Sequence, residues 1–248
     1  MKIAENLIER GRPLSRGRTI TDVRLGLDYT IVEISDGSAG LAWTPDKKQS
    51  GSCTHLRLAG CLLGMEAAEL LTWLASEKFL ERAIGLATFN ALNSTVDREL
   101  LEEESISLLK LQNTDHVVMV GYFAPLIPKI KATSCQLTVI ELDGEKPGVI
   151  GVGPGMTALA ACDVAIITST SIINNTIDGL LAVLSGHRAA VMIGPSTPVC
   201  PEVFAGTGIS QLSGAYVFDV DKAKIIVSQG GGTMLLKKTL RFASVQVT

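Results

Sequence analysis

The chain has 248 residues, of which 46% are hydrophobic and 19% charged, and its formal net charge is -3. This length is sufficient for a sizeable core, and the hydrophobic content excludes an intrinsically disordered chain. The weakly acidic balance lacks the basic field of a nucleic-acid-binding protein, so we expect no nucleic-acid partner.

The first half of the chain predicts a small α+β domain. Its expected elements, in order, are a helix at 3–10, strands at 20–27, 29–35 and 39–44, and helices at 65–75 and 77–93. Asp28 and the Asp36-Gly37 pair separate the three strands, and such close spacing is typical of an antiparallel meander. Ser76 is the expected N-cap of the last helix.

The second half alternates strands with helices. The expected strands are 116–121, 136–142, 148–151, 163–169, 189–193 and 215–219, and the expected helices are 123–131, 156–161, 176–185 and 222–228. Between Pro147 and His187 the only charged residues are Asp163 and Asp178, which favours a parallel sheet buried on both faces. The sequence therefore predicts an α/β protein with an α+β domain at 1–112 and a Rossmann-like, doubly wound sheet at 113–248.

The apolar runs and the cysteines predict whether the chain spans a membrane and in which compartment it is found. The mean hydropathy is +0.33, but the stretch 148–167 contains four glycines, Pro154 and Asp163, so it predicts no membrane span. The N-terminal segment lacks the apolar core of a secretory leader. Five cysteines at irregular spacing predict no disulfide framework, and we expect a cytoplasmic protein.

A ligand site is expected where the order of the predicted sheet reverses. In a Rossmann-like order of 3-2-1-4-5-6, ligands bind outside the carboxyl ends of strands 1 and 4. The loops there and after strand 5 are rich in Gly, Ser, Thr and Asn, although ordinary turn chemistry also uses these residues. The predicted site residues are Gly121, Tyr122, Phe123, Thr168, Ser169, Thr170, Asn174, Asn175, Thr176, Gly194, Pro195 and Ser196, together with Asn90 from the first domain.

Three glycine-containing segments are candidate phosphate sites. Gly121 is followed by Tyr-Phe-Ala-Pro rather than by the G-x-G-x-x-G pattern that cradles a dinucleotide, and Glu141 stands alone where a ribose-binding acid could lie. The segment 151–155 has the wrong spacing and is predicted to be a turn. The run 229–233 is either an anion-binding nest or a plain turn.

Several of these segments resemble a known family. The stretch DVAIITSTSIINNTIDGLLAVLSGHRAAVMIGPSTPVCPEVFAGTG (163–208) resembles the C-terminal domain of the bacterial and archaeal family described as putative heavy-metal chelation proteins, a family of unknown function. The segments VGYFAP (120–125), VEISDGSAGLAWTP (32–45) and ATFNALNS (87–94) are similar to other parts of it. The chain departs from the family pattern at Ser169 and Asn175, where glycine is expected.

The resemblance implies an enolase-N-like domain joined to a Rossmann-like domain, with a cleft between them and a role in handling a heavy metal or metal chelate. Hydroxyls, amides and carbonyls dominate the predicted site, and they suit a small polar ligand or a chelate better than a bare soft metal. One alternative is an enzyme with a nucleotide-like cofactor on the Rossmann-like domain. The other is a non-catalytic, homo-oligomeric binding protein such as a dimer. The sequence leaves open whether a reaction is catalysed.

Overall fold

The computed structural model describes residues 2–45, 55–141 and 148–248. An N-terminal unit holds a three-stranded antiparallel sheet in the order β1-β2-β3. Its elements are α1 (Ile3–Gly11), β1 (Ile20–Leu25), β2 (Tyr29–Ile34), β3 (Ala39–Trp43), α2 (Ala67–Thr72), the 3₁₀ turn η2 (Trp73–Ala75) and α3 (Phe79–Asn93). The meander predicted from the two short turns is confirmed.

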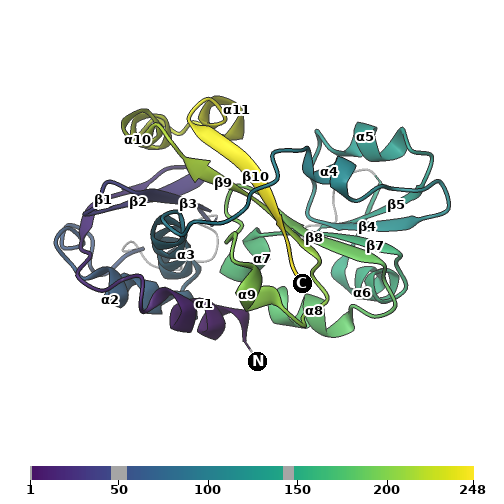
Figure 1. Cartoon of the computed structure of the whole chain (residues 1–248), viewed down its shortest axis with the longest axis horizontal. Helices are drawn as coiled ribbons and strands as arrows, with labels where there is room; N and C mark the ends of the chain where they lie inside the picture. Colours follow the sequence, from purple (N-terminus) through teal and green to yellow (C-terminus); the bar gives the residue numbers. More distant parts are fainter. Residues whose placement is uncertain (1, 46–54, 142–147) are drawn as a thin grey trace.

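Helix α3 covers one face of this sheet, and α1 and α2 pack against the side of α3 that faces away from the sheet (Figure 1). It contacts β3 so closely that a Cβ on Gly40 would lie 2.2 Å from the carbonyl oxygen of Ala87. The helix begins at Phe79, two residues later than expected, because the Ser76 hydroxyl accepts the N–H of Lys78 (3.1 Å) ahead of the first turn.

The C-terminal unit is built on a seven-stranded sheet in the order β10-β9-β8-β7-β4-β5-β6. Its strands are β4 (His116–Val120), β5 (Gln136–Ile140), β6 (Val149–Ile150), β7 (Val164–Thr168), β8 (Ala189–Ile193), β9 (Gln211–Val217) and β10 (Leu240–Gln246). The pairings from β6 to β9 are parallel, and β10 runs antiparallel to β9. The predicted α/β class and the reversal of strand order between β4 and β7 are confirmed.

Helices cover both faces of this sheet (Figure 1). They are α4 (Ser105–Leu108), α5 (Ile127–Lys131), α6 (Val152–Ala160), α7 (Thr170–Ile173), α8 (Ile177–Val183), α9 (Pro201–Phe204), α10 (Val220–Ser228) and α11 (Thr233–Leu236). Alternate residues of each central strand point to opposite faces, so Val117 packs near α4 and α5 while Val118 faces the other core. Ile106 of α4 packs with Val117, and we propose that the division between the units falls between 93 and 105 rather than near 112.

Several predicted boundaries were wrong for local reasons. Residues 152–155 form the first turn of α6 rather than a loop, since a proline in a first turn lacks an N–H that would be unpaired there anyway. Helix α5 begins at Ile127 rather than at 123. Strand β9 begins at Gln211, four residues before its predicted start, and β10 was not predicted. Both strands place polar side chains inside the sheet, with the Ser213 and Ser244 hydroxyls 2.8 Å apart, and this removes the apolar signal of a strand.

The two units pack closely where α10 meets β1 and β2. A Cβ on Gly26 would lie 2.3 Å from the carbonyl oxygen of Val227, and Lys224 Nζ lies 2.7 Å from Glu33 Oε2. The N–H groups of Gly230 and Gly231 donate to the carbonyls of Val227 and Ile226, which is the pairing of a Schellman C-cap. These two N–H groups are therefore occupied, and the glycine run caps α10 instead of forming an anion-binding nest.

Within the described ranges, no helix is both long and apolar enough to cross a membrane.

Candidate functional site at the sheet reversal

A small cavity lies at the carboxyl ends of β4, β5 and β7, where the strand order reverses. Its volume is about 90 Å³, and we call it the switch-point pocket. The residues lining it are Val120, Gly121, Ile140, Glu141, Val152, Met156, Thr168, Thr170, Ser171, Asn174, Thr176 and Leu180. Five of them were predicted site residues: Gly121, Thr168, Thr170, Asn174 and Thr176. A cavity therefore lies at the sheet edge where topology predicts a ligand site.

The floor of the pocket is formed by the turn from β7 into α7 and by the residue that follows β4. The Thr168 and Thr170 hydroxyls lie 3.0 Å apart, and Thr168 Oγ1 also accepts the N–H of Thr170 at 3.3 Å. Gly121 has a φ of +93°, and a Cβ there would lie 2.9 Å from Thr168 Cβ. A side chain at position 121 would thus strain the backbone and press on Thr168.

Asn174 presents one half of its amide to the pocket. Its Oδ1 accepts the N–H of Thr176 at 3.2 Å and the Thr176 hydroxyl at 2.7 Å. In the described part of the chain its Nδ2 makes no hydrogen bond, which leaves two donors for a ligand. The next residue, Asn175, has a φ of +62°, is exposed and lies outside the lining.

The pocket also contains residues that were not among the predicted site residues, although Glu141 was considered as a ribose-binding acid. Glu141 brings a carboxylate from the end of β5, and Val152, Met156 and Leu180 form an apolar wall from α6 and α8. Among the lining residues that the structure describes there is no lysine, arginine or histidine. The position of Glu141 at the end of the second parallel strand was a usable signal, whereas the apolar wall depends on where α6 begins.

The loop after β8 contributes to packing rather than to this cavity. Buried Ser169 lies against Gly194, since a Cβ on Gly194 would be 2.8 Å from Ser169 Oγ. Pro195 follows in the same loop, outside the lining. Tyr122 is exposed, and the half-buried Phe123 packs toward the core near α5.

Asn90 and Ser196 join the two units instead of facing the pocket. The Asn90 amide donates to the carbonyls of Leu41 (2.9 Å) and Ser196 (3.1 Å), and Ser196 Oγ accepts the N–H of Trp43 at 2.8 Å. The amide is therefore engaged with two backbone oxygens, which explains an asparagine late in α3.

The N-terminal unit reaches the switch-point pocket through α7. The Arg82 side chain of α3 is buried, and its Nε and Nη2 donate to the carbonyl of Ile172 at 3.2 and 2.8 Å. Burial lowers the pKa of the Arg82 guanidinium, and Asp178 partly offsets this. Because Thr170 and Ser171 of α7 line the pocket, Arg82 holds part of its wall in position.

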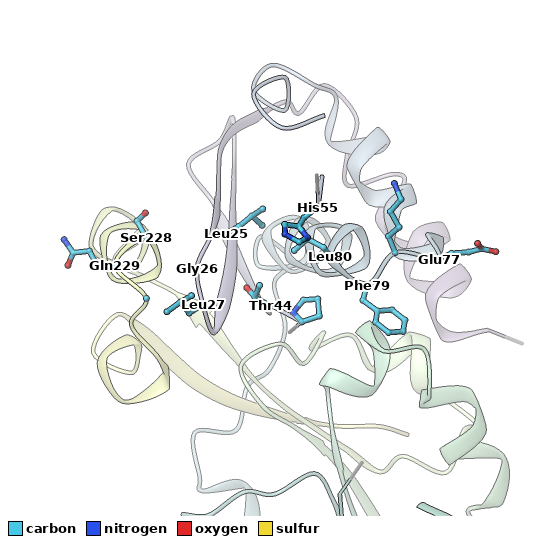
Figure 2. Close-up of a pocket in the computed structure, with 13 residues that line it drawn as sticks. Leu25, Gly26, Leu27, Thr44, His55, Glu77, Phe79, Leu80, Ser228 and Gln229 are labelled. Atoms are coloured by element: carbon cyan, nitrogen blue, oxygen red, sulfur yellow. The ribbon is translucent and has the colours of Figure 1, made fainter. Parts of the chain in front are cut away.

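A second, larger cavity of about 730 Å³ lies beside the N-terminal sheet and contains none of the predicted site residues. Figure 2 shows Leu25 and Leu27 of the β1–β2 turn, Phe79 and Leu80 of α3, and Gln229 beyond α10 around it. Its walls are largely apolar, and so are those of the switch-point pocket, where a few polar side chains from the strand ends stand among apolar ones.

A bare soft metal does not fit the switch-point pocket. Soft ions favour thiolates, thioethers and imidazoles, whereas the described lining offers hydroxyls, one amide, one carboxylate and the single thioether of Met156. Among the described residues, no group of three or more His, Cys, Asp and Glu side chains is placed to hold a metal ion.

The fold and the pocket define a two-unit α/β protein with a small cavity at the switch point of a Rossmann-like sheet. The chain belongs to the DUF364 family, described as "Putative heavy-metal chelation", whose model matches residues 104–246. A companion model with the same description, DUF4213, matches residues 5–93. The family inferred from the sequence resemblance is thereby confirmed.

Relatives support this assignment. The chain is 24% identical over 237 residues to the uncharacterized protein MJ0500 of Methanocaldococcus jannaschii, covering 92% of this chain and 90% of that protein. It is similar in fold to a DUF364 protein of unknown function from Pyrococcus horikoshii, with a TM-score of 0.87, 20% identity, and coverage of 99% of this chain and 100% of that one. A DUF364 protein from Desulfitobacterium hafniense gives a TM-score of 0.79, 21% identity and 98% coverage of both chains.

Proposed function

We propose that this protein binds a small polar ligand, or the organic part of a metal chelate, with a polar group seated in the switch-point pocket. The observation that carries the proposal is the convergence of the Asn174 amide with the Thr168 and Thr170 hydroxyls. These groups donate and accept hydrogen bonds without carrying charge. The family's association with heavy metals then refers to a metal held by its own ligands rather than by protein side chains.

The pocket selects the charge and the size of what enters. The described lining offers uncharged hydroxyl and amide groups beside the Glu141 carboxylate, and these groups suit a neutral hydroxylated group of the ligand. A volume of about 90 Å³ admits a group of a few heavy atoms, so the rest of a chelate-sized ligand extends outward past the exposed Val152.

A nucleoside is the second candidate, and Glu141 favours it. An acid at the end of the second strand of a Rossmann-like sheet is the group that hydrogen-bonds a ribose diol. The loop Gly121-Tyr122-Phe123 lacks the glycines that let a pyrophosphate approach, so the candidate is a nucleoside without a phosphate chain.

A thermal-shift screen distinguishes these candidates. The probes are Zn²⁺ and Ni²⁺ alone, ferric citrate, a hydroxamate-chelated iron, adenosine and NAD, tested on the wild type and on Glu141→Gln. We expect a chelate to raise the melting temperature of both proteins, because a ligand that binds the native state stabilises it. Stabilisation by adenosine that is lost in Glu141→Gln would favour the nucleoside. Stabilisation by the bare ions alone would contradict both candidates.

A further inference from the structure

The cavity of about 730 Å³ lies at the joint between the two units, and we call it the inter-unit cavity. One of its walls is formed where the β1–β2 turn meets the end of α10. A Cβ on Gly26 would lie 2.3 Å from the carbonyl oxygen of Val227, and Leu27 Cδ1 would lie 3.0 Å from a Cβ on Gly230. The start of α3 and the end of β3 form other walls (Figure 2). The described linings of this cavity and of the switch-point pocket share no residue.

Large apolar side chains surround the inter-unit cavity. Leu25 and Leu27 are 41% and 73% exposed, and the half-buried Pro45, Phe79 and Leu80 lie beside them in the lining. Single exposed apolar side chains are common on protein surfaces, whereas a group of them around one cavity marks a binding site. Small-molecule pockets have volumes of about 300–1,000 Å³, are lined mainly by apolar side chains and occur preferentially at interfaces between domains. The inter-unit cavity has all three properties.

Polar side chains of the lining are engaged by the protein itself. The Thr44 hydroxyl lies 2.9 Å from that of Thr30, and Ser228 donates its hydroxyl to a carbonyl of its own helix at 2.8 Å. Lys78 Nζ forms an ion pair with Glu81 at 2.8 Å. A ligand would have to compete with these contacts to form polar interactions of its own, so the apolar walls are what it can use.

Charge and sequence around the cavity also favour an uncharged apolar ligand. In the described lining Glu77 and Lys78 carry opposite charges, so their sum does not select an ion. The segment that links Pro45 to His55 lies outside the described residues, and its sequence, DKKQSGSCT, contains no leucine, isoleucine, valine, methionine or aromatic residue. This adjoining segment therefore supplies no large apolar side chain to match the leucines of the lining.

We propose that the inter-unit cavity binds an uncharged, apolar small molecule, such as a compound with an alkyl chain of several carbons. Removal of apolar surface from water drives this binding, and the exposed Leu25 and Leu27 are the side chains that gain most from being covered. Because the walls come from both units, the bound molecule contacts the β1–β2 turn and α10 together. This site is distinct from the switch-point pocket and takes a different class of ligand.

Fluorescence of N-phenyl-1-naphthylamine, an uncharged apolar probe, tests the site in the full chain. We expect the probe to bind at a single site and to be displaced by straight-chain alcohols from pentanol to nonanol. The Kd of the alcohols should fall about threefold to fourfold for each added CH₂ group. Failure of the probe to bind, or displacement that does not depend on chain length, would overturn the proposal.

Leu27→Gln tests whether binding occurs in this cavity, since a side chain that is 73% exposed can be replaced without disturbing the core. Leu63→Gln is the matched control, because Leu63 is 65% exposed and lies outside the described lining. Leu27→Gln should weaken binding of the probe and of octanol by about threefold to tenfold, while the control should bind both as the wild type does. Equal affinities in the two variants would contradict the proposal.

Sedimentation velocity of the wild type and of Leu27→Gln tests the other possible occupant, a second copy of the chain. We expect the two proteins to have the same oligomeric state. A dimer of the wild type that is lost in Leu27→Gln would show that the leucines form a contact between copies, and it would overturn the assignment of the cavity to a small molecule.

Discussion

Replacing Arg82 with methionine tests whether the N-terminal unit holds α7 in place. Methionine keeps most of the aliphatic packing but removes two hydrogen bonds to the carbonyl of Ile172 and a third, of 3.3 Å, to that of Ser76. The Ile172 carbonyl accepts two of these bonds and would lose both donors, which costs about 1–3 kcal/mol. Loss of the hydrogen bonds themselves, which come from a charged donor, adds about as much to the destabilisation. Relief of the desolvation of a buried cation offsets part of this loss.

The net destabilisation expected for Arg82→Met is about 2–3 kcal/mol, which corresponds to a fall of roughly 4–12 °C in melting temperature. Urea unfolding followed by circular dichroism measures it. Arg12→Met is the matched control. Arg12, the residue after α1, is 63% exposed, and its one ion pair within the described ranges is with Glu9 of that helix, so its loss should cost less than about 0.5 kcal/mol. If the two variants were equally stable, the structural role of Arg82 would be refuted.

Three further predictions concern packing, pH and thiol reactivity. Gly40→Ala should destabilise the protein by at least about 1–3 kcal/mol in thermal unfolding, because its Cβ would meet a backbone oxygen of α3. Gly179→Ala, on an open face of α8, should instead stabilise it by about 0.5–1 kcal/mol. A change of the same sign in both variants would contradict the packing. An arginine beside Asp115 lowers the pKa of that carboxyl below its usual value of about 3.9. The stability that the ionised carboxyl contributes is therefore present above that pH and is lost as the pH falls through the lowered pKa. The difference in urea stability between wild type and Asp115→Asn should therefore shrink from about pH 5 downward, and a constant difference would argue against this pairing. Iodoacetamide at pH 8 should label exposed Cys61 and spare Cys200, whose pKa is raised to about 11 by burial, as read by peptide mass spectrometry; rapid labelling of Cys200 in the native protein would contradict its burial.

The central sheet could be predicted because its strands carry a strong signal. After His116, strand β4 is apolar from Val117 to Val120, as a strand buried on both faces requires. The low charge after residue 147 extends this pattern to β7 and β8. Strand β10 could not be found in this way, because Ser244 is buried by hydrogen bonding to β9 rather than by apolar packing.

The site was predictable as far as topology determines it. Parallel strands bring their loops to one edge, and this rule alone placed Thr168 and Asn174 beside Gly121. Which polar residues of those loops face the cavity depends on contacts from the other unit, and composition does not encode them. Asn90 and Ser196 have suitable chemistry for ligand binding, but their hydrogen bonds to β3 use it for the joint between the units.

Titration calorimetry of Asn174→Ala tests the ligand pocket most directly, with the probe that gives the largest thermal shift as the ligand. The affinity is compared with that of the wild type and of Asn113→Ala, because Asn113 is exposed and lies outside the pocket. We expect Asn174→Ala to weaken binding by about 1–3 kcal/mol, which is roughly 5- to 150-fold in Kd. Asn113→Ala should bind as the wild type does. Equal affinity in all three proteins, with Asn174→Ala folded as judged by its unfolding transition, would show that the ligand binds elsewhere.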